Sequence, residues 1–327
     1  MSDTPVLQVR NLHVDYATPA GPVHAVRGVD LDVHRGELVG IVGESGCGKS
    51  TLAYAITRLL RAPAHLTEGT VTFHGTDGPV AVTGLTGRAL RRFRWERMSM
   101  VFQGAMNALN PVQRVAAQLH DVFRAHRPGM TKAERRTRID ELLELVGLPG
   151  RVARAYPHQL SGGMRQRVMI AMALALEPDV VVMDEPTTAL DVLVQREILD
   201  AVAELRERLG FAVVFITHDL SLLLEISDRI AVMYAGRVVE LADSKRLREE
   251  PRHPYSAGLL TAFPTLRSAR QDRHGIPGHP PDLSRPVAGC AFAGRCGLVV
   301  PECTTTDVRL RPVDGSDVAC LRAEVLR

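Results

Sequence analysis

A glycine-rich segment, GESGCGKST at residues 43–51, is the feature that most constrains the fold of this chain. It follows the apolar run ELVGIVG, which predicts a short buried strand, and precedes TLAYAITRLL, which predicts a helix. The spacing fits G-x-x-x-x-G-K-S/T, a loop whose backbone N–H groups converge on phosphate oxygens at a helix N-terminus. The segment therefore predicts a strand–loop–helix unit that binds nucleotide phosphates. In it, Lys49 meets the β- and γ-phosphates and Ser50 holds Mg²⁺.

A second apolar run, VVVMDEP, supplies the acidic partner that such a loop needs. Asp184 stands at the end of this predicted strand, where its carboxylate would reach the Mg²⁺ shell. Glu185 follows it and could polarise a water for in-line attack on the γ-phosphate. Alone, two acids after an apolar run are more simply a solvated strand end; paired with the glycine-rich loop they predict an ATP-hydrolysing site.

The chain alternates short apolar runs with helical patterns, which predicts a mostly parallel sheet covered on both faces. Segments with alternating polarity, such as LQVRNLHVDY and RIAVMYAGRVVEL, predict antiparallel strands beside it. Thr131 and Glu134 form a capping-box pattern at the start of an amphipathic helix that ends near Gly147. We expect a nucleotide-binding core with an antiparallel β subdomain at 1–103 and 176–250, and an α-helical subdomain at 104–175. The rest, 251–327, is expected to be an irregular C-terminal extension.

Composition excludes several classes of protein. Net charge is only +3 in 327 residues, too mild to argue for a nucleic-acid partner. The first ten residues lack the apolar segment of a signal peptide, and no apolar run approaches the 18 residues of a membrane span. We therefore expect a reducing cytoplasm, where clustered cysteines are more often metal ligands than disulfides.

Further motifs in the same order along the chain give a family resemblance. With LSGGMRQR (160–167), the chain resembles the ATP-binding subunits of ABC transporters, and the match covers residues 1–250. Gln103 in MVFQG matches the family's Q-loop, His218 in FITHD its switch histidine, and ALD (189–191) its D-loop. Tyr16 stands where the family places an aromatic ring against adenine; a strand residue packing on the core is the alternative.

The resemblance implies a P-loop NTPase (RecA-like) fold and assigns roles to the residues of these motifs. Catalysis is expected from Glu185, His218 and Gln103, with Ser50, Gln103 and Asp184 around Mg²⁺. Ser161, Gly162 and Gly163 open a helix and, in the family, face the ATP held by a second subunit. The full set expected to bind ATP is Tyr16, Gly43, Glu44, Ser45, Gly46, Cys47, Gly48, Lys49, Ser50, Thr51, Ser161, Gly162, Gly163 and Asp191.

The C-terminal extension narrows the resemblance. HPYSAGLL, GIPGHPPDL and GCAFAGRC, with ALNP (108–111) and YPHQLSGGM, are similar to dipeptide and oligopeptide importer ATPases. This implies a second ATPase subunit, usually a different chain, two membrane permease subunits, an external solute-binding protein, and a peripheral place on the cytoplasmic membrane face. Import of nickel or another small solute, and a non-transport ABC ATPase acting on nucleic acid, remain alternatives.

Four of the five cysteines lie in this extension, with the spacing C-x5-C-x6-C-x16-C at Cys290, Cys296, Cys303 and Cys320. Four thiolates can hold a [4Fe–4S] cluster or a tetrahedral zinc. Structural zinc sites usually use C-x2–4-C pairs, which this spacing lacks, and the resemblance implies a [4Fe–4S] cluster. The third alternative is that the four cysteines bind no metal and remain free thiols.

Overall fold

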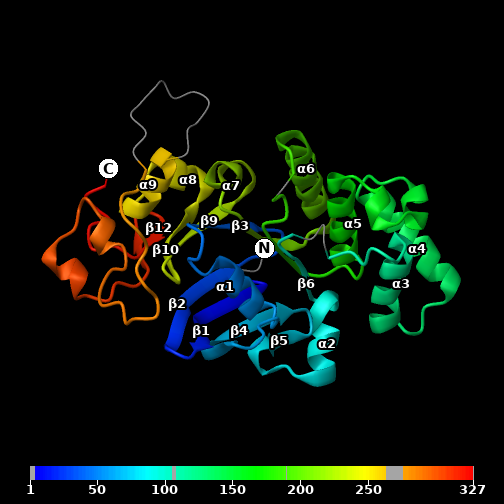
Figure 1. Ribbon diagram of the computed structural model, residues 1–327, viewed down its shortest axis with the longest axis horizontal. Coiled ribbons are helices and arrows are strands. Elements are labelled where there is room, and N and C mark those ends of the chain that lie inside the picture. Colours follow the sequence, from blue (N-terminus) through cyan, green and yellow to red (C-terminus); the bar gives the residue numbers. More distant parts are fainter. Residues whose placement is uncertain (1–3, 105–107, 189, 263–274, 327) are drawn as a thin grey trace. The chain divides into compact units, whose positions relative to one another are not determined.

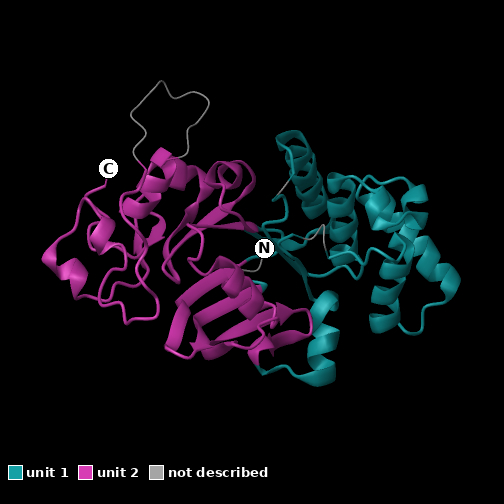
Figure 2. Ribbon diagram, in the orientation of Figure 1, with its two compact units in different colours: residues 1–6, 34–37, 84–215 teal, residues 7–33, 38–83, 216–327 magenta. Residues whose placement is uncertain are grey.

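The computed structural model describes residues 4–104, 108–188, 190–262 and 275–326. The chain divides into two compact units, each built from discontinuous segments (Figure 2). One comprises residues 1–6, 34–37 and 84–215, and is called here the helical unit. The other comprises 7–33, 38–83 and 216–327, and is called the loop unit because it contains the glycine-rich loop. Within the described ranges, no helix combines the length and apolar character that crossing a bilayer requires.

The loop unit contains a four-stranded antiparallel sheet in the order β2-β1-β4-β5 (Figure 1). Its strands are β1 (Leu7–Thr18), β2 (Gly21–Val33), β4 (Ala64–Gly75) and β5 (Gly78–Ala81). Inward residues of β1 such as Leu7 and Val9 are fully buried while their neighbours are half-buried, the alternation expected of a sheet with one covered face. The antiparallel strand predicted from LQVRNLHVDY is confirmed. The prediction for RIAVMYAGRVVEL is only partly right: its two strands pair antiparallel with each other, but they lie within the second sheet, where the first of them pairs in parallel with Leu38–Val42.

The same unit carries five strands of a second sheet, in the order β11-β12-β10-β9-β3. These are β3 (Leu38–Val42), β9 (Arg229–Tyr234), β10 (Arg237–Asp243), β11 (Arg311–Val313) and β12 (Ser316–Val318). β3 is buried along its whole length and pairs in parallel with β9, whereas β10 and β12 pair antiparallel. The helices are α1 (Lys49–Ile56), α7 (Leu220–Ile226), α8 (Ser244–Glu249) and α9 (Pro254–Ala262).

The helical unit holds β6 (Met98–Val101), β7 (Val180–Asp184) and nearly all of β8 (Ala212–Ile216). β6 and β7 pair in parallel, so their carboxyl ends lie at the same edge. Its helices are α2 (Gly87–Glu96), α3 (Val115–His126), α4 (Lys132–Leu145), α5 (Gly162–Leu174) and α6 (Val192–Leu209). The helix predicted from the capping box is confirmed as α4: the Thr131 hydroxyl accepts from the Glu134 N–H, and the Glu134 carboxylate accepts from the Thr131 N–H.

Candidate functional site

The glycine-rich loop lies between β3 and α1, as predicted, and close packing explains its glycines. Gly43 and Gly48 both have positive φ, at 159° and 104°. A Cβ on Gly43 would lie 2.1 Å from the Met233 carbonyl oxygen, and one on Gly48 would lie 2.3 Å from that of Ala25. Both positions therefore require glycine because neighbouring backbone leaves no room for a side chain.

Lys49, the first residue of α1, is 6% exposed and turns its amino group back onto the loop. Its Nζ donates to the carbonyl oxygens of Gly43 (2.7 Å) and Glu44 (3.0 Å). The buried Cys47 lies in the same loop, and burial raises the pKa of its thiol. The arrangement places one ammonium group and the N-terminal amides of α1 in a single loop, which is what an anionic phosphate chain requires.

Two other expected residues of the loop unit lie near strand or helix ends. The Tyr16 hydroxyl lies 3.1 Å from the Thr51 hydroxyl, so Tyr16 is held beside the first turn of α1. Its role against adenine remains a prediction. His218 is exposed in the turn between β8 and α7, where Asp219 caps α7 by accepting from the Leu222 N–H.

The helical unit brings the expected catalytic acid and amide together. Asp184 ends β7 and is fully buried, and Glu185 follows it with a positive φ of 45°. The Gln103 amide donates to the Glu185 carboxylate at 3.0 Å, and the Thr188 hydroxyl donates to the same oxygen at 2.9 Å. Parallel pairing of β6 with β7 explains the meeting, because both residues follow strands that end at one edge. Thr188 is a partner that sequence reasoning missed.

The signature residues open α5 as expected. The Ser161 hydroxyl accepts from the Met164 N–H, which makes it the N-cap. A Cβ on Gly163 would lie 2.6 Å from Val194 Cγ1, so this glycine allows α5 and α6 to approach closely. Asp191 caps α6 by accepting from the Val194 N–H at 3.0 Å. Of the ALD motif, Ala189 lies outside the described residues.

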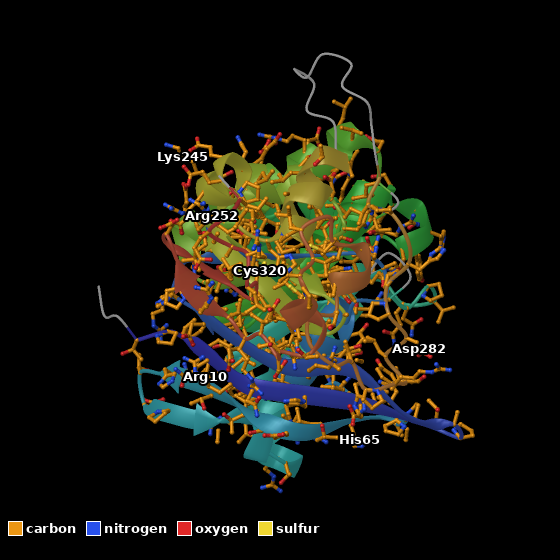
Figure 3. All side chains as sticks on the ribbon, turned by 90° about the vertical axis from the view of Figure 1, so that its left-hand side faces the viewer. Arg10, His65, Lys245, Arg252, Asp282 and Cys320 are labelled. Atoms are coloured by element: carbon orange, nitrogen blue, oxygen red, sulfur yellow. The ribbon has the colours of Figure 1, made fainter. Side chains whose placement is uncertain are left out.

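The four cysteines of the C-terminal extension (251–327, called the tail from here on) line one small cavity, together with His253 and Phe292. Cys320 is labelled in Figure 3. None of the described cysteines forms a disulfide. Within the described ranges, no three His, Cys, Asp or Glu side chains lie close enough together to hold a metal ion. The [4Fe–4S] cluster expected at these cysteines is therefore not confirmed. Burial raises the pKa of the Cys290 and Cys296 thiols, and that of Cys320 to about 11.

Sequence reasoning missed a set of contacts between the tail and the glycine-rich loop. Arg295, next to Cys296, forms two hydrogen bonds with the Glu44 carboxylate, at 2.9 and 3.0 Å. The Tyr255 hydroxyl accepts from the Glu44 N–H at 2.9 Å. The HPY tripeptide at 253–255 and the acid within the loop were the only signals, and neither indicates its partner.

Two family models match the chain. The model described as ABC transporter matches residues 26–188, and that described as oligopeptide/dipeptide transporter, C-terminal region matches residues 239–303. The second match covers α9 and three of the four tail cysteines.

Curated relatives are similar in sequence to this protein along nearly its whole length. The oligopeptide transport ATP-binding protein OppD of Mycobacterium tuberculosis is 46% identical over 99% of this chain, which spans about half (53%) of that relative's length. The dipeptide transport ATP-binding protein DppD of Bacillus subtilis is 45% identical over 89% of this chain and 86% of its own.

Solved structures resemble about three quarters of the chain. The dimeric ATP-binding cassette MJ0796, solved bound to ADP and Pi, has a TM-score of 0.63 and 32% identity, covering 73% of this chain and 98% of that one. The cassette cbiO1 from Clostridium perfringens gives 0.63 at 28% identity, covering 75% and 91%. The P-loop NTPase fold expected from the sequence is confirmed. The chain belongs to the ABC transporter ATP-binding family, and within it to the proteins that carry the oligopeptide/dipeptide transporter C-terminal region.

Proposed function

We propose that this chain is the ATP-hydrolysing subunit of an ABC importer for dipeptides or oligopeptides. The observation that carries the proposal is the glycine-rich loop, where Lys49 and the N-terminal amides of α1 offer positive charge and donors to a triphosphate. Lys49 binds the β- and γ-phosphates. Glu185 accepts a proton from the attacking water, and Gln103, already bonded to that carboxylate, orients it. His218 contacts the γ-phosphate.

Mg²⁺ is the metal that this chemistry uses, and the donors fit it. Asp184 contributes a fully buried carboxylate, and Ser50 contributes a hydroxyl in the first turn of α1. Both are hard oxygen ligands of the kind Mg²⁺ prefers. When bound, Mg²⁺ neutralises charge that develops on the phosphates.

The signature helix and the D-loop support a dimer of cassettes. Ser161 and the first amides of α5 form an N-terminus suited to a phosphate, and Asp191 lies at the neighbouring start of α6. Val192 and Leu193, which follow Asp191, are 80% and 78% exposed, an apolar pair that a second cassette would cover. We infer that a second subunit, usually a different chain, completes both sites at the cytoplasmic face of the membrane, attached to two permease subunits.

The tail favours peptide import over import of nickel or another small solute, and over a non-transport role on nucleic acid. It matches the C-terminal region described for oligopeptide and dipeptide transporters, and both curated relatives are named for peptide transport. An external binding protein would deliver the peptide to the permease. The cassette itself takes no part in selecting the peptide.

We further propose that the four-cysteine cavity holds a [4Fe–4S] cluster. The support is that the four cysteines line one cavity, and four cysteine thiolates are the usual ligand set of such a cluster. The His253 Nε2 is buried, lines the same cavity and has no hydrogen-bond partner in the described chain, so it is a suitable donor to a cluster sulfur.

Two measurements test these proposals. ATP hydrolysis should be followed in membranes that contain the co-expressed permease and partner subunits. Glu185→Gln should retain ATP binding but lose hydrolysis by at least about 100-fold, whereas Lys49→Ala should lose binding. ATP-independent uptake would refute the function.

Anaerobic purification with iron and sulfide assays tests the cluster. About four irons and four sulfides per chain would support it, and four titratable thiols without metal would refute it.

A further inference from the structure

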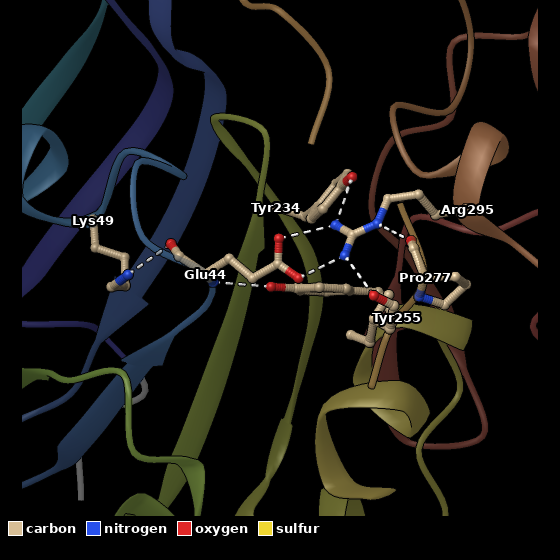
Figure 4. A network of polar contacts seen from close by, with 7 residues as sticks. Glu44, Lys49, Tyr234, Tyr255, Pro277 and Arg295 are labelled. Atoms are coloured by element: carbon tan, nitrogen blue, oxygen red, sulfur yellow. Dashed lines mark hydrogen bonds and ion pairs between the residues drawn. The ribbon is translucent and has the colours of Figure 1, made fainter. Parts of the chain in front are cut away.

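The tail holds Glu44 of the phosphate loop through both its side chain and its backbone (Figure 4). Besides its two bonds to Glu44, Arg295 donates from Nη1 to the Tyr234 hydroxyl at 3.2 Å and from Nε to the Pro277 carbonyl at 2.7 Å. The Tyr255 hydroxyl accepts from the Glu44 N–H. Its Nη2 also donates to the Ile276 carbonyl at 3.3 Å, so four residues fix the position of Arg295, and Glu44 is one of them.

Burial indicates that this is a built contact rather than a surface ion pair. The Arg295 side chain is only 7% exposed, and Tyr255 is fully buried. The Tyr234 ring lies 4.6 Å from that of Tyr255 and 5.3 Å, edge on, from that of Phe292, measured between centroids. Pairing with Glu44 raises the pKa of Arg295, so the guanidinium is charged at any pH at which the protein folds.

Hydrogen bonds of the HPY tripeptide (253–255) fix the position of Tyr255 beside the phosphate loop. The buried Glu240 carboxylate in β10 accepts from the backbone N–H groups of Arg252 (2.7 Å) and His253 (2.9 Å). His253 Nδ1 then accepts from the Tyr255 N–H at 3.0 Å. These three bonds fix the turn that starts α9, and so fix where the Tyr255 hydroxyl lies.

Glu44 also links the tail to the lysine of the site. The Glu44 carbonyl oxygen accepts from Lys49 Nζ, while its N–H and its carboxylate are held by the tail. The carboxylate lies in a loop that must receive an anionic triphosphate, so leaving it unpaired would repel the ligand. Arg295 removes that repulsion and at the same time orders the loop backbone.

We propose that Arg295 and Tyr255 are positioning residues that hold the phosphate loop in its nucleotide-binding form by neutralising and anchoring Glu44. The inference rests on the proposed function, because it concerns the affinity of that site for ATP. Arg295 touches no reacting atom and acts through Glu44. The tail is thereby part of the nucleotide site.

The test measures binding of AMP-PNP with Mg²⁺ to the full-length chain by calorimetry. Arg295→Met should raise the Kd about tenfold, a coupling typical of remote positioning. Tyr255→Phe, which removes one hydroxyl and is the milder variant if Arg295→Met folds poorly, should raise it about threefold. In hydrolysis assays, the KM for ATP should rise, whereas kcat should stay within about twofold of the value for the unaltered chain. Arg285→Met, at a tail arginine with an 84% exposed side chain, is the matched control and should change nothing.

A double-mutant cycle with Glu44→Gln separates positioning from general damage. If Arg295 acts through Glu44, the double variant Glu44→Gln with Arg295→Met binds more tightly than Arg295→Met alone, because no unpaired carboxylate remains. Additive losses would overturn the inference, as would equal Kd values for Arg295→Met and Arg285→Met. Failure of the unaltered chain to bind AMP-PNP would instead refute the proposed function.

Discussion

His253 should make this protein lose stability in mild acid. Its side chain is 1% exposed, and burial lowers the pKa of its imidazole to about 3, against 6.5 for a free histidine. Its Nδ1 accepts the Tyr255 N–H, so protonation there would also break the turn that starts α9. Between these two pKa values the unfolded chain binds a proton that the folded chain excludes, and the free energy of unfolding therefore falls as pH falls.

The size of the effect follows from the two pKa values. On going from pH 7 to pH 5, His253 should remove about 2 kcal/mol from the free energy of unfolding, and about 3 kcal/mol by pH 4. Urea unfolding of the reduced, metal-free chain at several pH values measures this slope. The glutamine of His253→Gln does not titrate. Over the same pH ranges, the free energy of unfolding of this variant should therefore fall by less than that of the unaltered chain, and the differences should equal those amounts.

The comparison of slopes is informative even if the glutamine variant is less stable at pH 7, because only the pH dependence is used. Parallel slopes for the two proteins would refute the reasoning. An independent check is the imidazole chemical shift of His253, which should not titrate between pH 5 and pH 8. A midpoint near 6.5 in the folded protein would mean that the imidazole is not buried as described.

Two further predictions concern backbone positions at the site. Asp191→Ala should lower the free energy of unfolding by about 1 kcal/mol, because the Val194 N–H loses its cap, while Asp191→Asn should retain most of it; urea unfolding compares the two. Gly46→Ala should cost about 1–2 kcal/mol, since its φ of 78° is strained for alanine but its surroundings are open. Gly43→Ala, whose Cβ would strike the Met233 carbonyl, should lower the melting temperature more than Gly46→Ala and abolish nucleotide binding.

The phosphate loop and the capped helix α4 could be predicted because their determinants are local. A glycine pattern between a strand and a helix specifies its own geometry within nine residues, and the Thr131–Glu134 capping box closes over four. The meeting of Gln103 with Glu185 needed one further step, the parallel pairing of the strands that precede them.

The contact between Glu44 and Arg295 could not be predicted in the same way. The two residues are 251 positions apart, and no periodic pattern relates them. From the sequence, Glu44 is one of the residues expected to bind ATP, and Arg295 is a polar residue beside a cysteine. Only the path of the tail, which depends on Glu240 and the HPY turn, brings them together.

Because the tail contacts both the sheet and the phosphate loop, its deletion is a poor test of what its cysteines do. The tail sequence has too little apolar periodicity to predict a core that folds alone. The structure shows which contacts with the cassette stabilise the tail. β12 pairs with β10 through Val318 and Glu240, and Phe292 packs against Tyr234 of the cassette. Deleting the tail would leave β10 as an unpaired edge, remove the cysteine cavity and release Glu44 in one step. A truncated chain that fails to hydrolyse ATP would therefore not distinguish a role for the cysteines from a role for Arg295. Arg295→Met leaves all four cysteines in place and removes the ion pair with Glu44 together with the bonds of Arg295 to Tyr234 and Pro277.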